Sequence, residues 1–322
     1  MAASFLLAPM AELSHRALRE LIESFGPPGT DEYFTEMISA GAFVNGGPFE
    51  HWYADNGPRP EKLVYQIVGG DEEQLLKAVS LLDRHECLGI DINMGCSAPA
   101  ITRTGAGVRW MADIDRAGAL IRRARPLTRR RLSVKLRTGL SDDFEYLVRF
   151  CRRLEEEGLD FITLHPRTAK EKFRRKARWD YVLALKKELN IPLAGNGDIV
   201  SAEEMLSRGG LCDAVMIGRL AVRQPWVFAE AKKVTDTAFK KVTDTASGSI
   251  STKIEETGLL FLELLSRYQP PEFHISRARR FFNYFCDNLK WGNYVKNLLN
   301  RETELSGIER AWKGFFSCFP LE

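Results

Sequence analysis

A thiol and an amide stand together at the end of one apolar segment. Leu88 to Met94 predicts a short buried strand that delivers Asn93 and Cys96 to its C-terminal end. Parallel α/β scaffolds commonly build reactive sites from side chains that follow strand ends. A thiol placed there is either an inert buried residue, a thiolate nucleophile that needs a nearby base, or a neutral general acid with a pKa of about 8.5. The residues alone leave these three interpretations open.

Polar side chains also lie inside or at the ends of other strand-like runs. A buried amide such as Gln66 needs hydrogen-bond partners, which either Asn93 or the edge of a bound heterocycle would supply. Lys135 lies in the middle of an apolar run, where an ammonium group is costly unless it meets an anion. The pyrimidine edge of a reduced flavin is such an anion. His165 is either a satisfied core histidine or a ligand contact.

Glycines and an arginine follow the last two strand-like runs. Asn196-Gly197-Asp198 follows the seventh run, and Gly218-Arg219 follows the eighth. In eight-stranded parallel barrels the loops at these two places commonly bind phosphate. Glycine permits close approach of the backbone, and arginine supplies a fork of donors. We therefore predict a phosphate site here, with simple tight turns as the alternative.

The elements that must position these residues alternate along the first 230 residues. We expect strands at 4–10, 33–37, 63–68, 88–94, 132–136, 161–165, 191–194 and 214–217, and helices at 14–25, 71–85, 113–125, 143–157, 179–189 and 202–207. The strands are apolar on both faces, and many helices open on Ser or Asp. Eight such units predict an α/β fold of the (β/α)8 TIM-barrel type. A doubly wound sheet is disfavoured because no glycine-rich nucleotide fingerprint follows the first strand.

The pattern changes after the eighth unit. Residues 232–238 recur as 240–246, a tandem KKVTDTA repeat that we interpret as a lengthened surface connection. From residue 255 onward apolar residues recur at helical spacing, which predicts a small all-α helical domain. The predicted segments are a catalytic barrel at 1–235, a linker at 236–254 and a C-terminal helical domain at 255–322.

Composition and charge restrict the kinds of protein that this chain can be. The chain has 322 residues, of which 44% are hydrophobic and 28% charged, so a large core is expected and extensive disorder is not. The net charge is only +3, but residues 165–178 carry seven Lys or Arg against one Glu, and residues 122–131 carry six Arg. Such local positive charge suits a polyanion. Six cysteines without a CxxC pair argue against a zinc site and fit a reducing cytoplasm. We expect neither a leader segment nor a membrane span.

Nine motifs in the correct order resemble the tRNA-dihydrouridine synthase family. They are Ala8-Pro9-Met10-Ala11, Glu36-Met37, Gln66-Ile67-Val68-Gly69, Asp91-Ile92-Asn93-Met94-Gly95-Cys96, Lys135-Leu136-Arg137-Thr138-Gly139, His165-Pro166-Arg167-Thr168, Trp179-Asp180, Asn196-Gly197-Asp198-Ile199 and Met216-Ile217-Gly218-Arg219. The match covers nearly the whole predicted barrel. The chain departs from the family pattern at Ser97, where proline is usual, and at Pro166, where the family often has Gly or Ala.

The resemblance implies an FMN-dependent oxidoreductase that uses NADPH to reduce uridine to 5,6-dihydrouridine in tRNA. It implies that Cys96 is the general acid and that the helical domain binds tRNA. The residues implied to hold or order the cofactor are Pro9, Met10, Ala11, Gln66, Lys135, His165, Asn196, Gly197, Asp198, Gly218 and Arg219; those near the substrate are Asn93, Arg137, Arg167 and Lys170. Basic residues interleaved with aromatics in the helical domain suit RNA: Arg277, Arg279, Arg280, Lys290 and Lys296. We expect a cytoplasmic monomer without a metal ion.

Two other functions stay open at this point. An FMN barrel that acts on a free pyrimidine, as dihydroorotate and dihydropyrimidine dehydrogenases do, would share the chemistry without needing a basic helical tail. The other alternative is an RNA-binding protein that keeps a flavin-binding scaffold but has no catalytic activity. The altered loop after Cys96 suggests this alternative.

Overall fold

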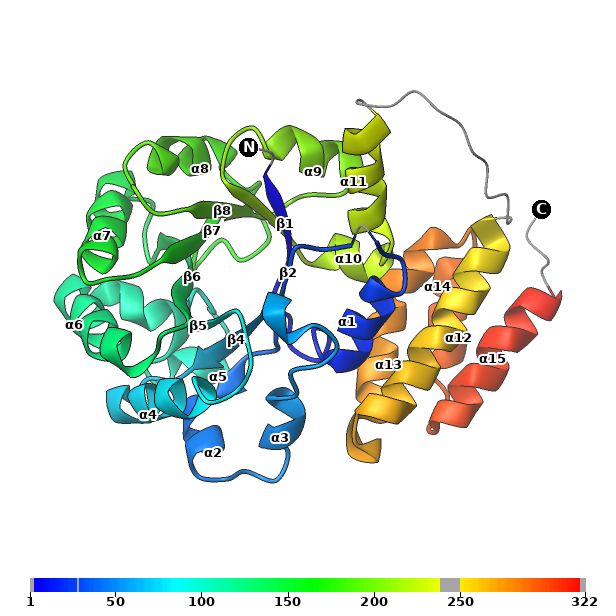
Figure 1. Cartoon of the computed structure of the whole chain (residues 1–322). Helices are drawn as coiled ribbons and strands as arrows, with labels where there is room; N and C mark the ends of the chain where they lie inside the picture. The colour runs from blue at the N-terminus through cyan, green and yellow to red at the C-terminus, as the bar shows by residue number, and fades with distance from the viewer. Residues whose placement is uncertain (1–2, 28, 238–249, 319–322) are drawn as a thin grey trace. The chain divides into compact units, whose positions relative to one another are not determined.

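The computed structural model describes residues 3–27, 29–237 and 250–318 (Figure 1). The chain divides into two compact units, one made of Met1–Pro9 and Asp31–Ile217, the other of Met10–Thr30 and Gly218–Glu322. These boundaries differ from the predicted domains, because residues 10–30 and 218–235 belong to the second unit. Helices α11 (Val227–Thr237) and α12 (Ile250–Tyr268) occupy both ends of the predicted linker, while residues 238–249 lie outside the described part.

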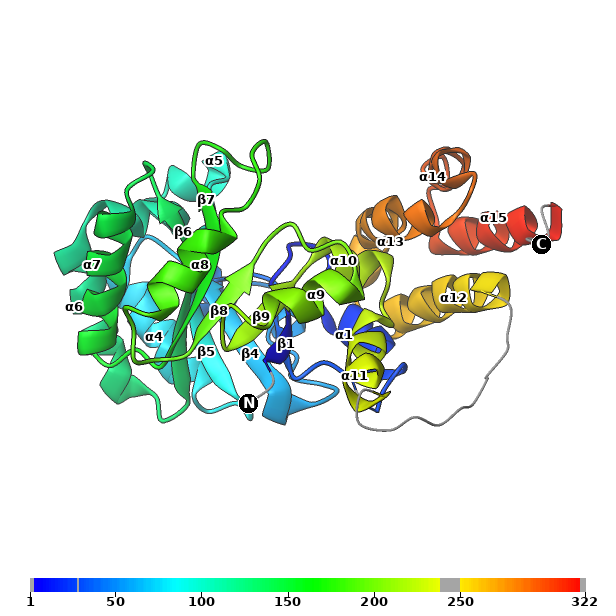
Figure 2. The same ribbon diagram turned by 90° about the horizontal axis from the view of Figure 1, so that it is seen from above.

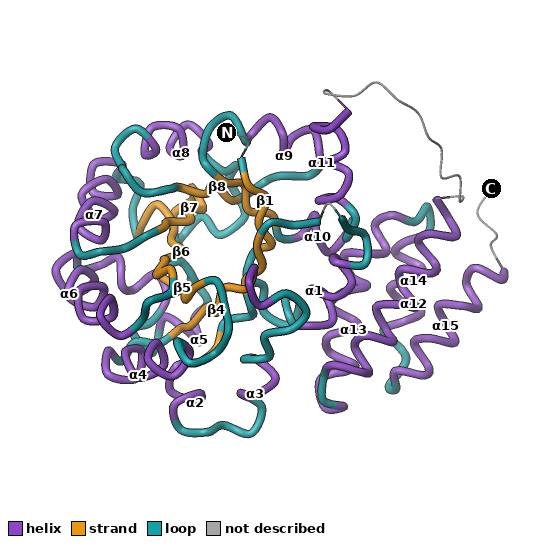
Figure 3. Tube along the Cα trace, in the orientation of Figure 1, coloured by secondary structure: helices purple, strands orange, loops and turns teal. Residues whose placement is uncertain are grey.

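Eight parallel strands close into a barrel within the first unit (Figures 1 and 3). They are β1 (Ser4–Leu7), β2 (Glu32–Phe34), β4 (Leu63–Val68), β5 (Gly89–Met94), β6 (Arg131–Gly139), β7 (Phe161–Thr168), β8 (Leu193–Asn196) and β9 (Ala214–Ile217). Strand β9 pairs with β1, and β2 pairs with β4, so the ring has no open edge. The short strand β3 (Ile38–Ser39) pairs only with the end of β4. The predicted TIM barrel is confirmed.

The barrel strands are buried on both faces. Every residue of β4, β5, β7 and β9 is buried, since alternate side chains point into the barrel and against the surrounding helices. Strands β6 and β7 extend about three residues beyond their predicted ends, through Gly139 and Thr168. These extensions carry polar side chains, which a search for apolar runs passes over.

Five of the eight helices described in the first unit begin after a Ser or Asp whose side chain caps them. The eight helices are α2 (Ala40–Val44), α3 (Glu50–Tyr53), α4 (Glu72–Leu82), α5 (Pro99–Thr102), α6 (Ile114–Ala124), α7 (Phe144–Glu156), α8 (Trp179–Lys186) and α9 (Ala202–Arg208). Those that begin with such a cap are α2, α4, α6, α7 and α9. Asp71, Asp113 and Asp143 each accept a hydrogen bond from the backbone N–H three residues later. The short helices α2, α3 and α5 were not predicted, because four or five residues are too few to show a helical period.

The second unit is built from helices alone in its described part. Besides α11 and α12 it contains α1 (Arg16–Glu23), α10 (Arg219–Arg223), α13 (Pro271–Phe285), α14 (Gly292–Leu299) and α15 (Leu305–Cys318). Aromatic rings form much of its core: Phe261 stacks on Phe281 with ring centroids 3.7 Å apart, and Phe282 packs on Trp312 at 4.8 Å. The predicted C-terminal helices are confirmed. None of the described helices combines the length and apolar character needed to cross a bilayer.

Candidate active site

The predicted reactive residues of the barrel strands gather at one end of the barrel. In a parallel barrel all strands end on the same side, and Figure 2 shows α5 and the connection from β7 to α8 at that side. Asn93 and Lys135 are partners across β5 and β6, and Arg137 pairs with His165 across β6 and β7. Cys96 follows β5 directly and is partly exposed.

A chain of hydrogen bonds runs through the buried polar residues of three neighbouring strands. Ser133 Oγ donates to Asp91 Oδ1, and Gln66 Nε2 donates to Asp91 Oδ2, both at 2.7 Å. Asn93 Nδ2 donates to Gln66 Oε1 at 2.9 Å. Asn93 Oδ1 then accepts the backbone N–H of Cys96 at 2.9 Å. Gln66 and Asn93 therefore satisfy one another, and together they fix the backbone that carries the thiol.

The altered loop after Cys96 is closed against the same strand end. The Val108 N–H donates to Cys96 O at 3.0 Å. Gly107 has a φ of +61°, and a Cβ placed on it would lie 2.4 Å from that carbonyl oxygen. Only glycine fits this position. Although Ser97 replaces the usual proline, the loop holds Cys96 by its carbonyl on one side while Asn93 holds its N–H on the other.

Asp91 is a buried member of this hydrogen-bond chain that the motif contained but that was not assigned a role. Its carboxyl group is fully buried, and burial raises its pKa to about 6, although hydrogen bonds from Gln66 and Ser133 and the charge of Lys135 oppose this rise. The sequence itself indicates that Asp91 belongs to a polar cluster. Polar residues at 91 and 93, and again at 133 and 135, occupy alternate positions of two apolar strands and so share one face.

The raised pKa of Asp91 predicts a measurable pH dependence of stability. Because the folded-state pKa of about 6 lies above the ordinary 3.8, the folded protein binds the extra proton between these values. The free energy of unfolding should therefore fall by about 2 kcal/mol as the pH rises from 4.5 to 7, through this group alone. In Asp91→Asn, whose amide oxygen can still accept from Gln66, this component should vanish.

Urea unfolding of both proteins at pH 4.5 and 7 measures this difference. Asp115→Asn is the matched control, since that carboxylate has 87% of its side chain exposed. An identical pH dependence in wild type and Asp91→Asn would contradict the raised pKa.

Lys135 supplies positive charge inside the barrel mouth. Within the described residues its ammonium group has neither a hydrogen bond nor an ion pair, and the side chain is only partly exposed. Burial first, and then the neighbouring Arg137, lower its pKa to about 8, while Asp91 and Cys96 act in the opposite direction. The group is still mainly charged at neutral pH, so it suits an anionic ligand.

Arg137 joins the loop after β5 to the loop after β7. Its side chain is buried, with 7% exposed. Nε donates to Gly95 O at 3.0 Å, and Nη1 donates to Thr168 O and Lys172 O, both at 3.3 Å. Burial and the charge of Arg167 lower its pKa. Arg137 therefore lies beside Cys96, as a substrate contact would, but part of its donor capacity is used inside the protein.

Arg167 and His165 form a second buried cluster at the end of β7. Arg167 Nη2 donates to both carboxylate oxygens of Asp198, at 2.6 and 2.5 Å. Its Nη1 lies 3.0 Å from His165 Nε2, and since a guanidinium group only donates, Nε2 is assigned as the acceptor and the proton to Nδ1. Arg167 is 2% exposed, so the structure gives it an ordering role, and its predicted contact with substrate stays a prediction.

The predicted phosphate loop is held tightly by its neighbours. Asn196 Nδ2 donates to Met216 O at 2.8 Å, and Trp179 Nε1 donates to Gly197 O at 3.0 Å. Gly197 has a φ of +123°, and a Cβ there would lie 2.9 Å from the His165 ring. The backbone conformation thus requires glycine, which is compatible with both the phosphate site and the tight-turn alternative.

The other residues predicted to contact a ligand follow strands β1, β9 and β7. Ser14 binds both the N–H and the C=O of Met10, at 2.9 and 3.2 Å, so these backbone groups already have partners. Pro9 is partly exposed and Ala11 exposed. Gly218 and Arg219 open α10, and Arg219 is exposed. Lys170 is exposed in the loop after β7. Their contacts with ligand stay predictions.

Most of the basic and aromatic residues proposed for RNA binding in the helical unit have structural roles. Arg277 is 2% exposed, Arg279 donates to Glu302 O at 2.8 Å, and Lys296 pairs with an aspartate. Phe281, Phe282 and Phe285 of α13 are core residues. Trp291 and Tyr294 differ, with 54% and 56% of their surfaces exposed.

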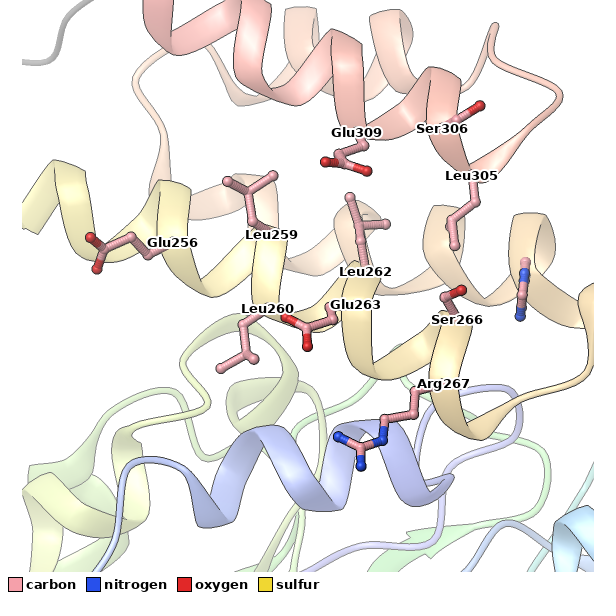
Figure 4. A pocket seen from close by; sticks show the side chains of 11 residues that line it. Glu256, Leu259, Leu260, Leu262, Glu263, Ser266, Arg267, Leu305, Ser306 and Glu309 are labelled. Atoms are coloured by element: carbon pink, nitrogen blue, oxygen red, sulfur yellow. The ribbon is translucent and has the colours of Figure 1, made fainter.

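A groove of about 840 Å³ lies between α12 and α15 of the helical unit (Figure 4). Leu259, Leu262 and Leu305 line it together with the carboxylates of Glu263 and Glu309. None of the predicted site residues borders it. Over the described ranges, His, Cys, Asp and Glu side chains do not gather in groups of three that could hold a metal ion.

Known proteins resemble this chain over most of its length. The sequence profile described as "Dihydrouridine synthase (Dus)" matches residues 6–306. A probable tRNA-dihydrouridine synthase of Aquifex aeolicus is 32% identical over 238 residues, covering 72% of this chain and 73% of its own. A second, from Rhizobium leguminosarum, is 32% identical and covers 69% of each chain. The tRNA-dihydrouridine synthase B of Pasteurella multocida is 26% identical over 98% of this chain and 93% of its own. The chain belongs to the dihydrouridine synthase family.

Proposed function

We propose that this protein reduces uridines of tRNA to 5,6-dihydrouridine, with FMN as cofactor and NADPH as electron donor. The observation that carries the proposal is the chain of hydrogen bonds from Ser133 to the backbone of Cys96. It fixes the backbone that carries the thiol near Lys135, whose ammonium group has no hydrogen-bond or ion-pair partner among the described residues. The printed names of the relatives support tRNA as the substrate.

The residues at the barrel mouth fit FMN. An ammonium group without a hydrogen-bond partner among the described residues suits the electron-rich pyrimidine edge of a flavin. Gln66 uses one amide N–H on Asp91, which leaves its second N–H for a ring carbonyl. The Gly197 backbone would take the phosphate end. Bound FMN would supply the hydride that adds to the uracil double bond.

Cys96 would complete the reduction by donating a proton. Hydride addition at one carbon of the uracil ring leaves negative charge that a proton on the neighbouring carbon must neutralise. The thiol gives that proton and becomes a thiolate. Lys135 and Arg137 both interact electrostatically with Cys96, so their positive charges would stabilise the thiolate as it forms.

The target base must leave its stack to reach this site. Unpaired loop nucleotides of tRNA are extracted more easily than paired ones. Asn93, whose amide ends are oriented by Gln66 and by the backbone of Cys96, would hold the position of the base relative to the thiol. Arg137 and the exposed Lys170 would lie near its phosphates.

A direct assay separates this proposal from a free-pyrimidine reductase. The protein is incubated with FMN, NADPH and unmodified tRNA, the RNA is digested, and nucleosides carrying two additional hydrogens are measured by mass spectrometry. Parallel reactions contain free uridine, uracil or orotate. Dihydrouridine formed only in tRNA is the expected result. Reduction of the free compounds with tRNA untouched would replace the proposal with the alternative. The monomeric state, the cytoplasmic location and tRNA binding by the helical unit stay predictions.

A further inference from the structure

Phe173 is an exposed aromatic side chain at the rim of the candidate site. It lies in the connection between β7 and α8, and 62% of its surface is accessible. A single exposed apolar residue on a surface needs no explanation. What distinguishes Phe173 is the set of charged groups beside its ring.

Two buried guanidinium groups flank the ring. The central carbons of Arg137 and Arg167 lie 5.9 and 6.0 Å from its centroid, and the His165 ring lies at 6.0 Å. Both arginines are fixed by hydrogen bonds to the protein, Arg137 through Gly95 O and Arg167 through Asp198. The ring therefore lies beside two guanidinium groups that are held in place by hydrogen bonds, while much of its surface is exposed.

The segment around Phe173 is strongly basic. Residues 170–176 include Lys170, Lys172, Arg174, Arg175 and Lys176, all of them exposed. The one acid, Glu171, is bound by Arg178 at 2.8 and 2.9 Å, and this contact lowers its pKa to about 2. The ionised carboxylate is held mainly by Arg178, with Arg175 Nε 3.9 Å away, so one negative charge stands against the five cations and the segment stays net positive.

Phe173 is linked to the segment of Cys96 through Arg137. Arg137 donates through Nε to the carbonyl of Gly95, which precedes Cys96, and through Nη1 to the carbonyl of Lys172, which precedes Phe173. One side chain therefore bridges the residue before the thiol and the residue before the aromatic ring.

We propose that Phe173 is a stacking platform for an unpaired base of the tRNA, the nucleotide next to the uridine that is reduced. An exposed aromatic ring among cations is the arrangement that binds single-stranded nucleic acid, because bases stack on the ring and phosphates meet the charges. Extraction of one base exposes the face of its neighbour, and Phe173 covers that face. This inference depends on the proposed action on tRNA, and it assigns a residue that recognises RNA beyond the reacting base.

Three substitutions separate stacking from packing. Phe173→Ala should lower kcat/KM for tRNA by about 10- to 100-fold, mainly through KM, because stacking of one base contributes about that factor. Phe173→Leu keeps an apolar side chain without a π face and should lose nearly as much, whereas Phe173→Trp should stay within about threefold of wild type. The control is Leu127→Ala, which removes an exposed apolar side chain before β6, at the other end of the barrel. Flavin content and the rate of flavin reduction by NADPH should not change in any variant.

Binding of unmodified tRNA, measured by fluorescence anisotropy, tests the inference without relying on turnover. Equal affinity of wild type and Phe173→Leu, or full affinity of Phe173→Ala, would overturn it. If the wild-type protein binds tRNA through Phe173 but never reduces it, the proposed function is contradicted. The role of Phe173 in binding an unpaired base is then still supported. A wild type that does not bind tRNA at all would overturn both.

Discussion

Replacing Cys96 with alanine is expected to lower the rate of tRNA reduction by about 100- to 10,000-fold, the range that a positioned general acid contributes. The thiol stands at the end of β5, and its backbone is fixed by Asn93 through the N–H and by the closed loop through the C=O. Because hydride transfer to the base cannot be completed without a proton, kcat should fall while FMN content and NADPH oxidation by the flavin remain. Single-turnover reduction of unmodified tRNA gives the rate directly.

Two further variants control this result. Cys212→Ala removes a partly buried thiol whose Sγ contacts Ala214 O at the start of β9, at the far end of the barrel, and should leave turnover unchanged. Cys96→Ser keeps a donor but with a far weaker acid, so it should resemble the alanine variant. Wild-type turnover by Cys96→Ala would remove the thiol from the mechanism.

Lys135→Met is expected to weaken FMN binding by about 10- to 100-fold without destabilising the protein that lacks flavin. A hydrogen bond from a charged group to a ligand contributes about 1.5–3 kcal/mol, which corresponds to that range. In the protein alone the ammonium group has no hydrogen-bond partner among the described residues, and burial lowers its pKa to about 8. Removing it relieves an unfavourable burial of charge, so thermal stability should be equal or higher.

Fluorescence quenching of FMN gives the affinity, and thermal unfolding gives the stability. In wild type the affinity should fall as the pH rises through about 8, where the ammonium group loses its proton, and Lys135→Met should lack this dependence. Lys186→Met is the matched control, because that lysine of α8 is also partly buried but pairs with Asp213. Unchanged FMN affinity in Lys135→Met would mean that another group meets the flavin.

Much of the barrel is predictable from sequence because its strands are buried on both faces. Eight continuous apolar runs, with Asp or Ser before the following helices, specify the strands and most of the large helices. The ends of β6 and β7 were harder to predict, because Arg137, Thr138, Arg167 and Thr168 are polar yet buried. Their burial depends on partners from distant loops, which local sequence does not display.

The types of residue in the candidate site could be predicted from the sequence, but the hydrogen bonds and ion pairs that join them could not. Lys135 and Cys96 could be chosen because each is chemically unusual in an apolar setting. That Arg167 would be neutralised by Asp198, and that Ser14 would bind the backbone of Met10, depend on pairings seen only in the folded chain. Asp91 was missed because its importance comes from Gln66 and Ser133 on neighbouring strands.

The most direct test of the account is the visible spectrum of the protein reconstituted with FMN, recorded without oxygen. NADPH should bleach the flavin absorption, and unmodified tRNA should then restore it as electrons pass to uridine. The Cys96→Ala protein should bleach normally but recover slowly. A flavin that is bleached by NADPH and is not reoxidised by tRNA, but is reoxidised by a free pyrimidine, would contradict the central claim.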